Sequence, residues 1–247
     1  MFNRHLAWIS LLLIASAHAH HPWVLSEQAN AAAGESMAFS VYFGHEFPIA
    51  EPLADERIDA VQLIGPDGDL IETGTADLTT GELEQPGFHV LGVQQSRGYW
   101  TRTTEGGRAQ SREGLPNAVH CSQSINGSKT FFQVGQGRDH ALSQALGHPL
   151  ELLIKSDPST LEADQEIRVA LVFNGPPQTG SVMLFDAESG EDPVETFTTD
   201  DDGLARLPIS GPAPWLLLAV VEEDYPDPQV CDVRRFRATL TIPAGAE

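Results

Sequence analysis

The sequence predicts an all-β protein of two β-sandwich domains, the second immunoglobulin-like, behind an N-terminal signal peptide. Three observations lead to this prediction. Short apolar or alternating runs recur along the chain, turn residues such as glycine, proline, asparagine and aspartate separate them, and helical periodicity is rare. A length of 247 residues suits one large domain or two small ones.

The first 19 residues have the three parts of a secretory signal peptide. Arg4 and His5 give a positive start, Leu6 to Ile14 form an apolar centre, and the Ala-His-Ala of residues 17–19 is a small-residue cleavage site. The apolar run is too short to span a membrane, and no later segment approaches the roughly 20 apolar residues that a span needs. We therefore expect an exported protein with no transmembrane segment after cleavage.

Residues 20–147 form the first predicted domain. Its first long strand runs from Met37 to Phe43, where every second residue is apolar, and it ends at the loop Gly44-His45-Glu46-Phe47-Pro48. Further strands are expected at 58–64, 69–72, 88–93, 99–103 and 130–134, followed by a short helix over 139–146 that begins at Asp139. Residues 104–117 have no period, which predicts a long loop.

Residues 148–243 form the second predicted domain, because the composition changes at Gly147-His148-Pro149. Seven short strands are expected, at 150–154, 166–173, 181–185, 194–198, 204–208, 215–221 and 235–242. Turn residues separate most of them, as in Asn174-Gly175-Pro176-Pro177. Seven strands at this spacing indicate an immunoglobulin-like sandwich.

The chain is strongly acidic, with 35 Asp and Glu residues against 14 Lys and Arg residues and a formal net charge of -21. Such a charge repels nucleic acid and anionic membranes, and it suits cations as ligands. The two cysteines, Cys121 and Cys231, are expected to pair in an exported protein. The alternative is that Cys121, which follows His120, is a thiolate ligand of a metal.

His20 is the first residue after the expected cleavage site. An N-terminal histidine offers its α-amine and its imidazole, which can together chelate one metal ion. The α-amine has a pKa of about 7.7–8.0, so it loses its proton to a metal easily. The apolar Trp23-Val24-Leu25 that follows would hold this terminus on the domain; the alternative is a terminus that frays.

Three other histidines are candidate metal ligands. His45 ends the first long strand and shares the side of its apolar residues if the alternation continues; the alternative is a loop histidine bonded to backbone. His89 lies in a strand, where it faces the same rim or is an ordinary surface residue. His120 would be fixed by a disulfide at the next residue. His21 points away from His20, and His140 and His148 are interpreted as solvated.

Metal binding is the function that these residues favour. Nitrogen ligands suit nickel, cobalt, copper and zinc, and copper binds most tightly in direct competition. The sequence contains no G-x-S-x-G, glycine-rich phosphate loop, C-x-x-C or H-E-x-x-H motif, so we do not expect an enzyme. Two alternatives stay open. One is a copper-dependent oxidative enzyme with Tyr42, Tyr99 or Trp100 on a flat substrate surface, and the other is a structural or adhesive sandwich.

Several motifs recur together along the chain after the signal peptide. They are His20 with Trp23-Val24-Leu25, Gly44-His45-Glu46-Phe47, His148-Pro149-Leu150-Glu151-Leu152-Leu153, Asn174-Gly175-Pro176-Pro177, Thr199-Asp200-Asp201-Asp202-Gly203 and Pro214-Trp215-Leu216-Leu217. The set resembles a bacterial family of periplasmic proteins known as a domain of unknown function and also as the nickel-uptake substrate-specific, NikM-like family. The resemblance implies a periplasmic protein that handles nickel or cobalt, with His20 and His45 as ligands and a membrane metal transporter as a partner.

Overall fold

The protein is nearly all β, as the sequence predicts. A computed structural model describes residues 20–26, 28–74, 78–137, 140–156, 166–209 and 212–243. The expected signal peptide, residues 1–19, lies outside this range. None of the helices in the described part is long and apolar enough to cross a membrane.

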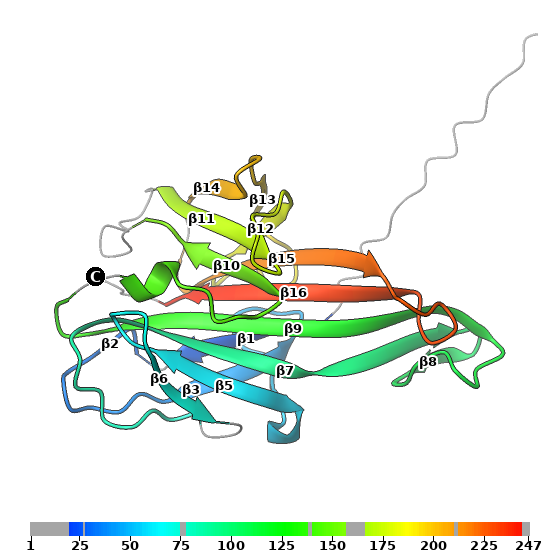
Figure 1. Cartoon of the computed structure of the whole chain (residues 1–247), viewed down its shortest axis with the longest axis horizontal. Helices are drawn as coiled ribbons and strands as arrows, with labels where there is room; N and C mark the ends of the chain where they lie inside the picture. Colours follow the sequence, from blue (N-terminus) through cyan, green and yellow to red (C-terminus); the bar gives the residue numbers. More distant parts are fainter. Residues whose placement is uncertain are drawn as a thin grey trace, which may run out of the picture.

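A sheet of ten strands runs through the molecule (Figure 1). Across the sheet the order is β13 (Glu195–Thr198), β12 (Ser181–Phe185), β15 (Trp215–Asp224), β16 (Val233–Ile242), β9 (Ala118–Val134), β7 (Gly87–Thr103), β5 (Ile58–Ile64) and β6 (Leu70–Gly74). The short strands β2 (Asn30–Ala31) and β8 (Gly106–Arg108) pair with β9 and β7. Strands from both sides of Gly147 share this sheet, because β16 pairs with β9 in parallel. The division into two domains at Gly147 stays a prediction.

Two three-stranded sheets cover the large sheet. One consists of β1 (His21–Ser26), β3 (Phe39–Gly44) and β4 (Glu51–Pro52), and the other of β10 (Leu150–Ile154), β11 (Glu166–Phe173) and β14 (Leu204–Pro208). Successive residues of a strand point to opposite faces. Thus Val90 and Phe131 pack with β10, β11 and β14, whereas their neighbours Leu91 and Phe132 pack with β1 and β3. The described residues therefore form a core on each face of the large sheet, and a third, smaller cluster surrounds Trp23 where β1 meets β12 and β15.

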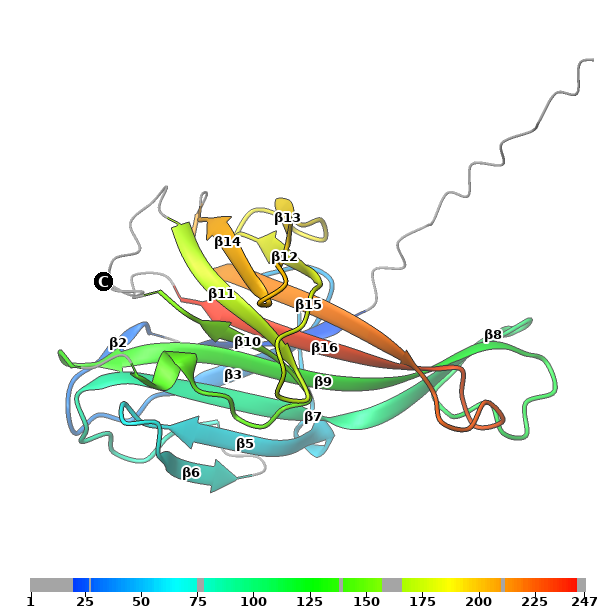
Figure 2. The ribbon, with the colours of Figure 1, turned by 45° about the horizontal axis from the view of Figure 1, so that its top comes forward.

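The strands β7 and β9 are longer than the sequence suggests. Each has 17 residues, and their far ends extend beyond the smaller sheets together with β8 (Figure 2). The two strands expected at 88–93 and 99–103 are parts of one strand, β7. They are separated by a bulge, where the register shifts between Gln95 and Gly98 while both flanks pair with β9. The expected loop over 104–117 contains β8. The helix expected over 139–146 is the 3-10 turn η2 (His140–Ser143), and Asp139 lies outside the described residues.

Cys121 and Cys231 form a disulfide, as expected, with their Cα atoms 4.9 Å apart. The bond joins β9 to the segment between β15 and β16 and ties the extended ends of the long strands together. It also excludes Cys121 as a thiolate ligand of a metal.

Candidate functional site

The pairing of β1 with β3 brings His20 and His45 together. The two strands are antiparallel, with Pro22 opposite Phe43 and His21 opposite Gly44. One further step in this register places His20 opposite His45. Residues that face each other across a strand pair lie on the same side of the sheet and in contact distance. The centres of the two imidazole rings are 3.8 Å apart, with an angle of 50° between the ring planes.

Strong contacts hold β1 in this position. Trp23 is completely buried, its indole Nε1 donates a hydrogen bond to the carbonyl oxygen of Pro48 at 2.8 Å, and its ring packs on Phe47. On the neighbouring large sheet, the hydroxyl of Thr239 donates to the carbonyl oxygen of Pro22 at 2.8 Å. A side chain at Gly44 would meet the Cβ of Ala50 at 2.7 Å, so this turn needs a glycine. The segment that follows His20 is therefore anchored, as expected from Trp23-Val24-Leu25.

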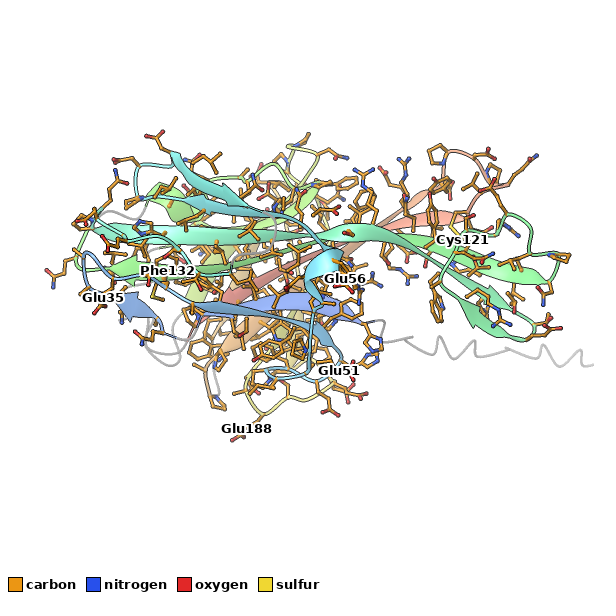
Figure 3. The ribbon with its side chains drawn as sticks, turned by 90° about the horizontal axis from the view of Figure 1, so that it is seen from below. Glu35, Glu51, Glu56, Cys121, Phe132 and Glu188 are labelled. Atoms are coloured by element: carbon orange, nitrogen blue, oxygen red, sulfur yellow. A yellow bond between two sulfur atoms is a disulfide. The ribbon has the colours of Figure 1, made fainter. Side chains whose placement is uncertain are left out.

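The imidazole of His20 also stacks on the ring of Phe43, with the ring centres 5.3 Å apart. The guanidinium of Arg57 lies over the same phenyl ring, 4.2 Å from its centre. Glu51, whose backbone pairs with Phe43, contributes the nearby negative charge. Figure 3 labels Glu51 at this edge of the small sheet. A phenyl ring, a guanidinium and a carboxylate thus lie close to the His20 ring.

The environment keeps the His20 ring neutral. Partial burial lowers the pKa of His20, the neighbouring His45 lowers it further, and the carboxylate of Glu51 opposes these effects. A neutral imidazole has a free nitrogen lone pair, which is the form that a metal binds. The electrostatics therefore leave His20 in the state that coordination requires.

The Nδ1 atom of His45 is buried and has no hydrogen-bond partner in the described part of the chain. Buried polar atoms without partners are rare and need an explanation. The alternative, a loop histidine bonded to backbone, is therefore not realised through the Nδ1 atom. A metal ion that accepts the lone pair of Nδ1 would explain the position of this atom beside His20.

His89 does not join this pair. It is completely buried, its Nδ1 contacts the carbonyl oxygen of Gly87 at 3.1 Å, and its ring stacks on Phe132 with centres 5.2 Å apart. It is therefore neither a rim residue nor a surface residue. In the register of the large sheet, His89 lies opposite Phe132 of β9. His20 lies near Arg237, which pairs with Asn126 of the same strand. The six residues from Asn126 to Phe132 correspond to about 20 Å along the strand.

His120 lies the same distance from Asn126 in the other direction along β9. It faces Arg102 in the register, and its Nδ1 is 3.8 Å from the carboxylate of Asp232. The disulfide fixes this region, as expected, but at the extended end of the strands. Of the four candidate ligands, only His20 and His45 are brought together.

The sequence also led to predictions for the histidines outside this set of four. His21 points away from His20, as expected, and packs on Trp23 and Phe185. The interpretation of His148 as solvated is wrong, because it is buried against the large sheet. Nothing is described of the His140 side chain. Across the described ranges, no group of three or more His, Cys, Asp or Glu side chains has the geometry to hold a metal.

The aromatic residues considered for a flat substrate surface do not surround the pair. Tyr42 packs on Trp23, and the hydroxyl of Tyr99 bonds to that of Tyr225 at 2.8 Å. Trp100 is 55% exposed but faces Ser122 near the extended end of β9. One residue close to the pair was missed by sequence reasoning, the buried Arg237 of β16, whose charge acts on His20. An arginine in an alternating strand gives no signal of such a role.

One family model matches residues 17–223, under the description "Domain of unknown function (DUF4198)". No curated protein matches the chain. Several solved structures are distantly similar. Salmonella alpha-2-macroglobulin reacted with methylamine is 10% identical with a TM-score of 0.28, and the match covers 90% of this chain but 15% of that chain. The D0-D1 domain of Intimin is 12% identical with a TM-score of 0.22, and the match covers 90% and 97% of the two chains.

The BSP domain of a biofilm associated protein is 16% identical with a TM-score of 0.23, and the match covers 91% of this chain and 30% of that chain. This chain thus spans a small part of the macroglobulin and about a third of the biofilm protein. TM-scores this low carry no argument about function.

Proposed function

The chain belongs to this domain-of-unknown-function family, and we propose that it binds a divalent transition-metal ion, nickel, cobalt, copper or zinc, between His20 and His45. The single observation that carries the proposal is the contact of two imidazole rings, 3.8 Å apart, at the start of an anchored strand. Metal–nitrogen bonds of about 2.0–2.1 Å place two nitrogens on one ion about 3 Å apart. To bind one ion, the two rings would turn so that one nitrogen of each points at it.

The donor chemistry supports the proposal. The His20 ring is held neutral by its surroundings, and the Nδ1 atom of His45 is buried without a partner in the described part of the chain. Two imidazoles alone bind weakly, and a third donor is needed. Cleavage before His20 would create an α-amine that chelates the same ion together with the ring.

In this proposal the protein is exported to the periplasm and acts there as a carrier or buffer of the metal, in line with the NikM-like resemblance. A membrane metal transporter is the proposed receiver or donor of the ion. No catalytic step is proposed, because the metal is the cargo of the protein.

The test is calorimetric titration of the chain that begins at His20, with any tag at the C-terminus, using nickel chloride and copper chloride. His20→Ala and His45→Ala should each weaken binding by at least about 100-fold, because even partners of metal ligands typically contribute 10–100-fold. His120→Ala is the matched control and should bind like the parent. Unchanged affinity in His20→Ala would overturn the proposal.

A second chain with one glycine added before His20 separates the two donors of this residue. The added residue turns the α-amine into a peptide nitrogen and leaves the ring in place. Weaker binding in this chain supports the amine as a ligand, whereas equal affinity contradicts that part of the proposal.

A further inference from the structure

Arg237 is a buried cation without a carboxylate partner. Arg237 is 5% exposed. Its Nη1 atom donates hydrogen bonds to the hydroxyl of Ser124 at 3.3 Å and to the side-chain oxygen of Asn126 at 3.4 Å. Among the ion pairs of the described residues none involves Arg237. The carboxylate of Glu222 attracts the Arg237 guanidinium, but Glu222 is bonded to Arg235. Burial of a charge without a directly bonded partner of opposite sign is costly, so a guanidinium in this position normally faces an anion.

Arg237 lies beside the histidine pair. Thr239 of the same strand bonds to the backbone of Pro22, so β1 lies over β16 at this point. Alternate residues share one side of a strand. Two residues back along each strand, Thr239 is followed by Arg237 and Pro22 by His20, so these two residues lie on the same sides as Thr239 and Pro22. The charge of Arg237 accordingly acts on His20.

The charges around the pair favour a metal that carries an anion over a bare metal ion. Arg57 and Arg237 both act on His20, whereas Glu51 is the single carboxylate that does so. Two guanidiniums repel a dication, and one of them is buried, where charges are screened least. A metal that carries an anionic ligand of its own avoids this repulsion. The planar guanidinium with its fork of N–H donors matches a carboxylate especially well.

We propose that the His20–His45 pair takes its metal as a complex with a small carboxylate, whose oxygen atoms bind the guanidinium of Arg237. The imidazole nitrogens occupy positions on the metal that the carboxylate leaves open. No covalent bond is made or broken in this step, and no electron is transferred. The inference rests on the proposed function and adds the chemical class of the cargo.

Equilibrium dialysis of the chain that begins at His20, with nickel chloride and radiolabelled citrate, tests the inference. The protein should retain citrate in proportion to nickel, and it should retain little citrate when nickel is left out. Arg237→Gln should lower citrate retention by about tenfold or more, as expected for the loss of a hydrogen bond between charged groups. Its binding of nickel from nickel chloride alone should not weaken.

Folding is checked by circular dichroism, because Arg237 is buried. Arg237→Lys keeps the charge but not the fork, so it should fold and retain citrate at an intermediate level. Arg206→Gln is the matched control, since Arg206 is exposed and pairs with Glu166 on the other small sheet. This variant should behave like the parent.

The outcomes separate the two proposals. If the parent chain retains nickel but no citrate when both are supplied, the inference is overturned and the proposed function stands. Citrate bound equally without nickel also overturns it, because the anion site would then be independent of the metal. If neither is retained, both proposals fail. Nickel-dependent citrate retention that Arg237→Gln leaves unchanged overturns the assignment of Arg237.

Discussion

Replacement of His148 by glutamine should make the stability of the protein less sensitive to acid. The His148 ring lies against the large sheet, where a Cβ at Gly127 would come within 2.5 Å of its Nδ1 atom. Its Nε2 contacts the side-chain oxygen of Gln62 at 3.2 Å, while Nδ1 is buried without a partner in the described structure. A protonated ring at this site would therefore carry a poorly solvated charge.

The size of the effect follows from the pKa of His148. Burial and, to a lesser extent, the ammonium of Lys129 lower it from 6.5 to about 4, while the carboxylate of Glu151 opposes them. Between these two pH values the unfolded chain binds a proton at His148 and the folded chain does not. Stability therefore falls as the pH falls through this window. One pKa unit corresponds to about 1.36 kcal/mol, so the full loss from this residue is about 3 kcal/mol.

The assay is urea unfolding of the parent chain and of His148→Gln at pH 7 and at pH 4.5. The parent should lose about 2–3 kcal/mol more than the variant between these conditions. Each protein serves as its own reference, so a constant destabilisation by the substitution does not affect the comparison. Equal losses in the two proteins would show that the ring is not held neutral by burial.

Two further predictions concern groups away from the histidine pair. Lys129→Met leaves the buried carboxylate of Glu151 without its cation and should lower the free energy of unfolding by about 3–5 kcal/mol. A second change, Glu151→Gln, should restore part of this loss. Denaturant unfolding measures both variants, and a double variant no more stable than the single one contradicts the reasoning. Replacement of Cys121 and Cys231 together by alanine should cost about 2–5 kcal/mol, because the bond closes a loop across 110 residues. A cost close to zero in the same assay would argue against it.

The all-β class was predictable because alternation and turn residues are local signals. Met37 to Phe43 alternates in sequence and forms β3 with little change of bounds. The length of β7 was not predictable, since Gly98 has the chemistry of a turn. Its place inside a strand depends on β9, which pairs with both flanks, and the extra residues form a bulge in β7 itself.

Two of the four expected ligands come together, and strand pairing again decides which ones. His20 and His45 meet because the β1–β3 register brings them opposite each other, and both lie next to recognisable features, the cleavage site and the end of a strand. His89 and His120 lie on strands whose positions along the sheet are set by pairing over long distances. The sequence holds no local record of that pairing, so spacing alone did not separate near candidates from distant ones.

The sequence by itself determined the strands, the cysteine pair and the anchored segment after His20, because each depends on residues whose chemistry acts locally or has a single partner. Only the tertiary structure decided which charges surround the histidine pair. Arg237 and Pro22 are far apart in the chain, and they become neighbours because β1 packs on β16. Burial then deprives the guanidinium of solvent, which changes an ordinary strand arginine into a candidate anion site.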